Sequence, residues 1–587
     1  EAKVGIIPPT SDQVLVGDME RTRLKDIKIV FFVGVNEGKI PKEQQAGKLL
    51  SDLNREELKG SLKERGLSLA PTAKENLYTQ KFYLYLNLTK PSERIYLSYS
   101  RLSSSGEPLS PSFLVSQIQK LFPDAIREWD VPLFAESKYG ALDKLSEEIR
   151  KQDRTSPVFE ELMSWFTSQK DYAELINGLI DAAYYVNPQE SISKGVAEAL
   201  YGTELSNSAS RLEQFAKCAC SHFLSYGLML RERVRYEFNM ADMGTFLHNS
   251  LDLFARKVRE QGKSWIDLED EERDTLAENC VTEVVEKSGE TILLSSARNA
   301  YIINRVKCMV KRSVWALQNQ LKQGEFYPAL TEWAFGEKDN IDSLNFDLAA
   351  GQKLYLKGRI DRIDVCQDKE NHLYVKVIDY KSGTTQLDLI KLYYGLQIQL
   401  ALYLNAALEL EKKRFPDKIV QPAGVFYYNT KDPILNKEDV KNPENPQEEI
   451  LKKLKMDGIC SSEPEILQKL DKNLAVGKSV ESFAVPVKYT AKGTFSSNSK
   501  VANQKEFAIM MEYVQDKAKK IGREILKGNT SVNPFEWKKE NACEYCPYKE
   551  ICGFDEKLPG YEYRKLEKDK SSNLWCLMEE EMERGEK

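Results

Sequence analysis

Two aspartates and one lysine have the types and the spacing of a metal-dependent hydrolytic site. Asp361 ends the sequence Gly-Arg-Ile-Asp, and eighteen residues later Asp379 opens the sequence Asp-Tyr-Lys, which ends at Lys381. Carboxylate oxygens are the ligands that hard cations such as Mg²⁺ prefer. A bound metal ion lowers the pKa of water and neutralises charge that develops on a phosphate. These three residues could therefore support hydrolysis of a phosphodiester bond.

A predicted β-hairpin would position these residues. Residues 354–365 and 373–380 are rich in Leu, Ile, Val and Tyr, and a polar turn separates them, which predicts two antiparallel strands. With the turn centred near Glu370, the two aspartates lie opposite each other, about 5 Å apart at Cβ, and the lysine shares their face. Carboxylates at this separation can share one cation.

The same register makes a prediction for the other face of the hairpin. It places Asp364 opposite Lys376, so we expect these two residues to form a cross-strand ion pair rather than to bind metal. The register is an assumption at this stage. A slip of one residue would exchange the two faces and give the metal ion to Asp364.

Length and composition indicate a globular protein with two or more domains. The chain has 587 residues, of which 41% are hydrophobic and 30% charged. It contains no run of about 18 apolar residues, and its N-terminus lacks the charged-then-apolar pattern of a signal peptide. We therefore expect a cytoplasmic protein without membrane association. The first residue is Glu1 rather than Met, which suggests that the chain begins partway through a longer protein.

The overall charge does not predict a general nucleic-acid-binding surface. The net charge is −6, whereas phosphate contacts require clustered Lys and Arg, so any contact with DNA must be local. The candidate clusters are Arg231, Arg233 and Arg235; Arg305, Lys307, Lys311 and Arg312; and the stretch Lys488–Lys500. For each cluster taken alone, a solvated helix face is the more common explanation.

Hydrophobic patterning divides the chain into segments of different character. Residues 26–35 and 94–99 have strand-like sequences and residues 73–88 have a helical pattern, which is typical of part of a parallel-sheet α/β domain. We predict four segments: an α/β segment at 1–125, a helical connector at 126–204, a third domain with the acidic hairpin at 205–575, and a charged tail at 576–587.

Three cysteines within ten residues indicate a second metal centre. They are Cys543, Cys546 and Cys552, and core cysteines of a cytosolic protein rarely lie so close together in sequence. A zinc ribbon would supply a second close cysteine pair, and none follows in the sequence. A fourth ligand must therefore come from elsewhere. The scattered residues Cys280, Cys308, Cys366, Cys460 and Cys576 are predicted to be core residues.

The order of these motifs resembles the RecB-family nucleases of the PD-(D/E)XK superfamily. The resemblance includes His248 at the end of Gly-Thr-Phe-Leu-His, within a helical pattern, and a helical segment at 391–410. It implies that His248 and Asp361 bind Mg²⁺, that Asp379 completes the site, and that Lys381 stands beside the attacking water. It also implies that a glutamine of the 391–410 segment is catalytic. The preferred match is Gln397, with Gln399 a weaker choice, and Glu332 fits a further family position.

The cysteines also have a counterpart in this family. The sequence Ser-Arg-Leu-Glu-Gln-Phe-Ala-Lys that leads to Cys218 resembles a stretch whose cysteine binds a [4Fe-4S] cluster. The resemblance implies that Cys218 joins Cys543, Cys546 and Cys552 as the fourth ligand, although Cys220 could compete for iron. Ligands 325 residues apart would close a long loop, and restraining that loop is worth on the order of 5 kcal/mol. The cluster would act as a structural staple.

The N-terminal segment resembles the last motif region of a RecA-like helicase domain. Leu88-Thr89-Lys90 has a lysine where active helicases have an arginine that contacts nucleotide phosphates. None of the Gly-Lys pairs in the sequence has the preceding glycine of a phosphate-binding loop. The family as a whole binds ATP, but we expect no ATPase activity from this chain alone.

Together these motifs resemble the B-subunit family of AddAB-type (RexAB) ATP-dependent helicase-nucleases. The expected fold class is α/β: a partial RecA-like helicase remnant followed by a PD-(D/E)XK nuclease domain stapled by an iron–sulfur cluster. The resemblance implies a heterodimer with an A-type motor subunit. It also implies processing of double-strand DNA ends for recombinational repair, with cutting of the 5′-terminated strand. Two alternatives remain: a DNA-binding, Chi-recognising scaffold with a degenerate nuclease, and a stand-alone RecB-like iron–sulfur exonuclease.

Overall fold

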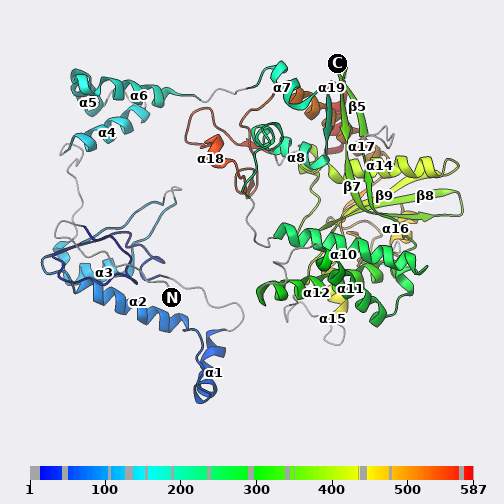
Figure 1. The fold of residues 1–587 in the computed structure, drawn as a ribbon, viewed down its shortest axis with the longest axis horizontal. Coiled ribbons are helices and arrows are strands. Elements are labelled where there is room, and N and C mark those ends of the chain that lie inside the picture. Colours follow the sequence, from blue (N-terminus) through cyan, green and yellow to red (C-terminus); the bar gives the residue numbers. More distant parts are fainter. Residues whose placement is uncertain are drawn as a thin grey trace. The chain divides into compact units, whose positions relative to one another are not determined.

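The chain forms two compact units, Glu1–Leu179 and Ile180–Lys587, and each has its own hydrophobic core. Their helices and strands are labelled in Figure 1. The computed structural model describes residues 14–42, 51–103, 107–125, 137–151, 156–186, 191–233, 240–287, 297–336, 344–349, 351–433, 435, 446–474, 479–567 and 574–585.

The N-terminal unit contains a parallel pair of strands, as the sequence predicted. Strand β1 (Ile29–Phe32) pairs with β2 (Arg94–Leu97), and helix α2 (Ala73–Leu88) precedes β2 along the chain. A capping box begins α2, because the side chains of Thr72 and Glu75 each accept a hydrogen bond from the other residue's backbone N–H. A small core forms from Val35, Leu84 and Leu114.

Most of the other described elements of this unit are helices, and one more helix, α7, lies near the start of the second unit. They are α1 (Asp52–Glu64), α3 (Phe113–Leu121), α4 (Lys138–Lys151), α5 (Pro157–Ser168), α6 (Ala173–Tyr184) and α7 (Lys194–Tyr201). Helices α4 to α7 lie in the segment predicted as a connector. The boundary between the two units falls inside α6, after Leu179.

A mixed six-stranded sheet forms the centre of the second unit, in the order β11-β10-β9-β8-β7-β4. Its strands are β4 (Tyr327–Phe335), β7 (Gly358–Gln367), β8 (His372–Lys381), β9 (Ile419–Asn429), β10 (Asp457–Ser461) and β11 (Val501–Ala502). The pairs β4–β7, β7–β8 and β9–β10 are antiparallel, whereas β8–β9 and β10–β11 are parallel.

Helices cover both faces of this sheet (Figure 1). One core contains α8 (Ala209–Lys217), α14 (Gln399–Arg414) and α17 (Gln504–Leu526), and the other contains α10 (Met240–Glu260), α11 (Asp270–Lys287) and α12 (Ala297–Gln323). Side chains alternate along a strand, so Val377 faces the first core and Ile378 the second. Two faces of one hairpin therefore have different surroundings.

Shorter elements complete this unit. The helices are α9 (Ala219–His222), α13 (Leu389–Tyr393), α15 (Pro446–Lys453), α16 (Pro464–Leu470) and α18 (Lys549–Cys552), and a π-helical turn spans Phe223–Gly227. A small sheet contains β12 (Phe535–Trp537), β13 (Glu540–Asn541) and β14 (Arg564–Lys565). Within the described parts of the chain, every helix is too short or too polar to cross a bilayer.

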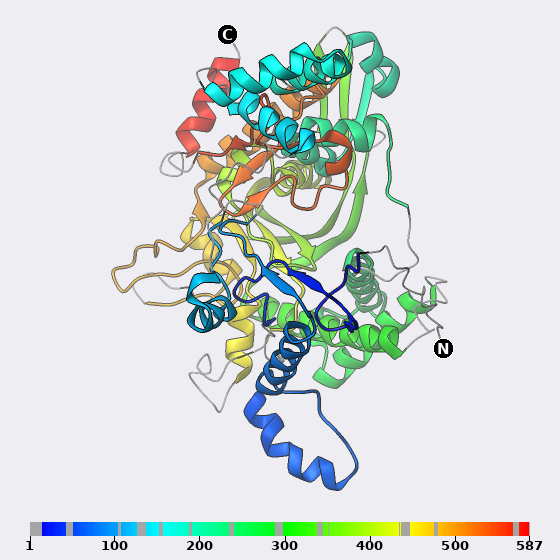
Figure 2. The same cartoon turned by 90° about the vertical axis from the view of Figure 1, so that its left-hand side faces the viewer.

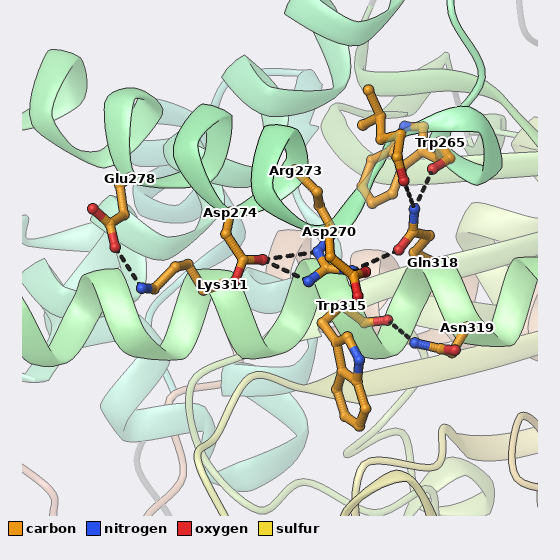
Figure 3. A network of polar contacts seen from close by, with 10 residues as sticks. Trp265, Asp270, Arg273, Asp274, Glu278, Lys311, Trp315, Gln318 and Asn319 are labelled. Atoms are coloured by element: carbon orange, nitrogen blue, oxygen red, sulfur yellow. Dashed lines mark hydrogen bonds and ion pairs between the residues drawn. The ribbon is translucent and has the colours of Figure 1, made fainter. Parts of the chain in front are cut away.

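A buried arginine ties α11 to α12, as Figure 3 shows. Arg273 is only 4% exposed, and its guanidinium donates hydrogen bonds to Asp270, Asp274 and the Gln318 side chain of α12. The Gln318 amide donates in turn to the carbonyl of Trp265 at 2.9 Å. Because the buried charge has carboxylate and amide partners, it stabilises the helical layer to which α10 belongs.

The strand predicted at 354–365 is in fact two strands in different sheets, so that prediction was wrong. Strand β6 (Gln352–Leu356) pairs with β3 (Glu204–Asn207) and β5 (Asn345–Ala349), whereas β7 begins at Gly358. A Cβ on Gly358 would lie 2.8 Å from the Phe335 ring. Glycine is therefore required where the chain leaves one sheet and enters the other.

The charged tail predicted at 576–587 was also wrong, because most of it is an ordered helix. Helix α19 (Leu574–Gly585) packs against α17, and the two lie side by side in Figure 2. Met578 is fully buried, and Glu581 accepts hydrogen bonds from Tyr513 at 2.9 Å and Lys517 at 2.8 Å. The acidic sequence thus forms a helix with a buried methionine and a partly buried carboxylate.

Candidate active site

The hairpin has the register that the sequence predicted. Strands β7 and β8 pair Asp364 with Lys376 and Arg362 with Ile378, so the next position along the strands brings Asp361 opposite Asp379. These two aspartates are 8% and 3% exposed. The candidate metal-binding acids are therefore Asp361 and Asp379, and no register slip puts Asp364 in their place.

Asp361 belongs to a cluster that could hold a metal ion. The ligand atoms of His248, Glu332 and Asp361 all lie within 4.8 Å of one another. His248 projects from α10 and places Nδ1 3.2 Å from Asp361 Oδ2, and that oxygen also accepts a 2.6 Å hydrogen bond from the Tyr380 N–H. One nitrogen and two carboxylates from a helix and two strands thus converge on one point.

Glu332 occupies a strained position on β4. Its neighbours Thr331 and Trp333 pair with Arg362 and Ile360, which places Glu332 across from Asp361. Its φ is +49°, a left-handed conformation that is uncommon for a residue with a side chain and that concentrates at functional sites. The family resemblance suggested Glu332, and the structure brings it next to the predicted ligands.

The site carries more negative charge than its own residues neutralise. Burial and the nearby Asp361 raise the pKa of Glu332 to about 7 and that of Asp379 to about 6. Burial lowers the pKa of His248, but its hydrogen bond to Asp361 and the negative charges of Asp361, Asp379 and Glu332 together outweigh this effect, so the pKa is raised. Crowded carboxylates with raised pKa values are the arrangement that a divalent cation would stabilise.

Lys381 is held beside the second aspartate. Its Nζ lies 2.6 Å from Asp379 Oδ2 and donates to Gln399 Oε1 at 3.4 Å. The Gln399 Nε2 donates to Asp379 Oδ1 at 3.2 Å and to the Tyr403 hydroxyl at 3.1 Å. The acid, the lysine and the glutamine therefore form one hydrogen-bonded group.

The glutamine in this group is not the one that sequence reasoning preferred. Gln397 accepts a hydrogen bond from the Asp388 N–H at 2.9 Å and donates to the Gln386 carbonyl at 3.1 Å, so it braces the loop after β8. The location predicted for Gln397 is occupied by Gln399. The helix predicted at 391–410 is broken into α13 and α14, and Gly395 between them has φ +80°. The break sets which glutamine begins α14.

Sequence reasoning also missed Glu213 on α8. Its Oε1 accepts a 3.0 Å hydrogen bond from the backbone N–H of Gln399, the first residue of α14. Burial raises the pKa of Glu213 to about 7. This carboxylate therefore holds the end of the helix that carries Gln399. Glu213 belongs to the Ser-Arg-Leu-Glu stretch that leads to Cys218, and that stretch gave no reason to place it near the acids.

The predicted cysteines come together in the fold. One small cavity is lined by Cys218, Cys220, Cys543, Cys546 and Cys552. Cys218 ends α8, and the Ala219 N–H after it donates to the Asn533 side chain at 2.9 Å, which joins the two cysteine-bearing regions of the chain.

Two of the thiols in this cavity, those of Cys220 and Cys543, favour their neutral form when no cation is bound. Burial and neighbouring thiols raise the pKa of Cys220 to about 12 and contribute to raising that of Cys543 to about 11. Binding a metal would release their protons. Of the cysteines predicted to be core residues, Cys308 and Cys576 are exposed, so that prediction was wrong for these two.

Comparisons with known proteins agree with this geometry. A B subunit of an ATP-dependent helicase/deoxyribonuclease from Lachnoclostridium phytofermentans is 39% identical over 595 residues, which cover 99% of this chain and 50% of that protein. Proteins of the same name from Alkaliphilus metalliredigens and Alkaliphilus oremlandii are 35% and 33% identical, each over 97% of this chain and 50% of the relative. The chain thus spans about half the length of the curated relatives it matches. The family model of the PD-(D/E)XK nuclease superfamily matches residues 206–553, which include His248, the acidic hairpin and all five clustered cysteines, and the chain belongs to that superfamily.

Proposed function

We propose that this chain is a metal-dependent deoxyribonuclease that hydrolyses phosphodiester bonds of single-stranded DNA. The observation that carries the proposal is the convergence of His248, Glu332 and Asp361 within 4.8 Å, beside the Asp379–Lys381 ion pair. A nitrogen, two carboxylates and an adjacent ammonium are the groups that metal-assisted hydrolysis requires.

The residues of this site would have separate roles. His248, Glu332 and Asp361 would hold one Mg²⁺ ion, which would lower the pKa of water and neutralise charge on the phosphate. Asp379 accepts from Lys381 and Gln399 and so fixes the lysine ammonium over the site. Held there, Lys381 can orient a water molecule for attack and stabilise the negative charge that develops on phosphate oxygens.

The test is an assay on end-labelled single strands with the whole chain. We expect cleavage with Mg²⁺ and none with a chelator. A 5′ label that appears in short products before a 3′ label does would support the proposed action on the 5′-terminated strand. Intact substrate under all conditions, with DNA binding retained, would instead favour a scaffold with a degenerate nuclease.

We propose in addition that the cysteine cavity holds an iron–sulfur cluster. What supports this proposal is that the cavity gathers five cysteines from two distant regions of the chain, and four cysteine thiolates are the ligand set of a [4Fe-4S] cluster. Cys218, Cys543, Cys546 and Cys552 would bind the [4Fe-4S] cluster, which would link α8 to the C-terminal region.

Replacing Cys546 by Ser should remove iron and lower the melting temperature, because the link between the two regions would be lost. The measurements are iron and acid-labile sulfide analysis together with thermal unfolding. The exposed Cys308 provides the matched control, and Cys308→Ser should leave both quantities unchanged. Full iron content and unchanged melting in Cys546→Ser would contradict the proposal.

The relatives suggest the setting in which this nuclease acts. They are named as B subunits of helicase/deoxyribonucleases, so we propose that this chain is part of a heterodimer with an A-type motor subunit that processes double-strand DNA ends. The N-terminal unit, with its parallel β1–β2 pair and Lys90 in place of an arginine, would be an inactive helicase remnant. Co-purification with the motor subunit and a DNA end tests this part of the proposal.

A further inference from the structure

The structure distinguishes among the three basic clusters of the sequence. In the second cluster Lys311 forms an ion pair with Glu278, and Arg312 lies 3.3 Å from Asp432. Arg305 is exposed in that cluster but lines none of the cavities described. Two basic residues of a cluster are thus already neutralised by neighbouring acids.

Two of the three lysines of the third cluster are neutralised in the same way, whereas Lys492 is exposed and lines none of the cavities described. Lys488 lies 3.4 Å from Glu481, and Lys500 lies 2.8 Å from Asp457. Lys500 also donates a hydrogen bond to the Leu387 carbonyl, so this lysine helps to stabilise the fold. These lysines are poor candidates for a phosphate contact, because an incoming phosphate would compete with a carboxylate already in place.

The first cluster differs from the other two. Arg231 and Arg233 are exposed, and within the described residues neither forms an ion pair; Arg235 lies outside those residues. Arg231 lines a pocket of about 270 Å³ together with Arg211 of α8, Tyr226, Met229 and Tyr548. No acidic side chain lines this pocket.

Aromatic side chains build the walls of the pocket. The Arg211 guanidinium lies over the Tyr226 ring at 4.7 Å, which fixes the arginine while leaving its N–H groups available. The Tyr548 hydroxyl donates to the Leu230 carbonyl at 2.8 Å and accepts from Ser225 at 3.1 Å. Met229 at the rim is 69% exposed, so an apolar surface adjoins the two cations.

We propose that this pocket binds a phosphodiester group of single-stranded DNA. Two guanidinium groups hold the phosphate oxygens, because arginine recognises phosphate through paired N–H donors. The neighbouring base packs on the exposed Met229 and the tyrosine walls, which suits a single strand because its bases are free to leave the stack.

The position of the pocket deepens the proposed function, on which the inference rests. Arg211 and Glu213 are two residues apart on α8, and at 3.6 residues per turn they project to nearly opposite sides of the helix. Glu213 contacts the helix that begins beside the acids, so the pocket lies across one helix, roughly 10 Å in diameter, from that group. A DNA strand held in this pocket would be anchored next to the site of cleavage.

The test measures binding rather than cleavage, so it is independent of nuclease activity. Labelled oligothymidylate is titrated by fluorescence anisotropy in the presence of a chelator, with the whole chain carrying Asp379→Ala. Against that background, Arg211→Ala with Arg231→Ala should raise Kd at least about tenfold and reduce the slope of log K against log salt by about 1. Arg233→Ala removes one positive charge outside the pocket and is the matched control for the single variant Arg231→Ala.

Further results bear on the proposal. Arg211→Lys keeps the charge but loses the paired donors, and an affinity between those of the parent and the double variant would support it. Equal losses in Arg233→Ala and Arg231→Ala, or an unchanged Kd and salt slope in the double variant, would overturn it. A loss confined to duplex DNA would overturn the assignment to single strands. Absence of cleavage by the unmodified chain with normal binding would count against the proposed function and leave this inference intact.

Discussion

The two faces of the β7–β8 hairpin carry similar charged residues, but they differ in how far the negative charge of the aspartates is balanced by nearby cations. On one face Asp361 and Asp379 stand opposite each other, and burial with mutual repulsion raises the pKa of Asp379 to about 6. On the other face Asp364 is fully buried between two cations, Arg362 and Lys376. On the first face one lysine, Lys381, pairs with one of two aspartates, whereas on the other face two cations pair with a single aspartate.

The face that carries Asp364 has the geometry of a structural ion cluster. The Arg362 Nε and Nη2 donate to the two Asp364 oxygens at 2.6 and 2.8 Å, and Lys376 Nζ lies 3.2 Å away. Burial opposes ionisation, but Arg362 and Lys376 outweigh it and lower the pKa of Asp364. Buried acids are thus no evidence of a metal site by themselves, since the difference lies in what the opposite side chain provides.

The largest difference between the faces should appear when one aspartate is removed from each. Asp379→Ala removes the partner that fixes Lys381, so we expect Mg²⁺-dependent cleavage of single-stranded DNA to fall by about 10³-fold. The melting temperature should change little, because the variant loses a carboxylate whose charge is disfavoured. Asp379→Asn, which keeps the shape, should be similarly inactive. Undiminished cleavage by either variant would contradict the assignment.

On the other face the same type of change should act on stability. Asp364→Ala leaves Arg362 and Lys376 buried without their anion, and breaking a buried ion pair in this way costs about 3–5 kcal/mol. Urea unfolding measures this loss, and the exposed Asp347→Ala is a control that should lie near zero. The variant should still cleave DNA at a temperature where it is folded. Normal stability with lost cleavage would mean that the roles of the two faces are reversed.

The sequence predicted this division because alternation along strands is a strong constraint. The register, the Asp364–Lys376 pair and the α/β fold class could all be obtained from residue order, since shifting a hairpin by one residue exchanges its faces. Glu332 and Glu213 were harder to assign, because they reach the site from β4 and α8, and their positions depend on how distant elements pack.

Sequence reasoning preferred Gln397 over Gln399 because it did not anticipate a break in the predicted helix. The 391–410 segment has a continuous helical pattern, and only Gly395, at φ +80°, breaks it. A Cβ at that glycine would lie 3.3 Å from Ala216 of α8, so close packing against another helix also favours glycine at the break. Helix propensities within the segment contain no information about the contact between Gly395 and α8. The break at this glycine decides whether Gln397 or Gln399 faces Asp379.

The acid face should also respond to metal in a pH-dependent way. The raised pKa values of Glu332, about 7, and Asp379, about 6, mean that the metal-free folded protein holds protons that the unfolded chain has lost. Their contribution to stability is therefore present below about pH 4.5 and is lost as the pH rises through 6 to 7. Mg²⁺ binds the ionised carboxylates, so the stabilisation it gives grows over the same range.

Thermal unfolding with and without Mg²⁺ checks this expectation. At a concentration a hundredfold above Kd the metal should stabilise the fold by about 2.7 kcal/mol, which corresponds to a rise of several degrees near pH 8 and little change near pH 5.5. Glu332→Gln removes one ligand and should reduce the rise at the higher pH. A rise that is independent of pH would show that these carboxylates are not the binding groups.

The smallest expected effect tests how the acid face is supported from α8. Glu213 accepts the Gln399 N–H at 3.0 Å, and loss of such a helix-end contact costs about 1 kcal/mol. Glu213→Ala should therefore let Gln399 move from Asp379 and Lys381 and lower kcat about tenfold, with KM almost unchanged. Glu213→Gln keeps an oxygen acceptor of the same length and should retain most of the activity. If both variants lose activity equally, the carboxylate charge rather than the hydrogen bond supports the site. If neither variant loses activity, the N–H of Gln399 needs no partner from α8. The acid face would then position Gln399 without help from the helix that leads to Cys218.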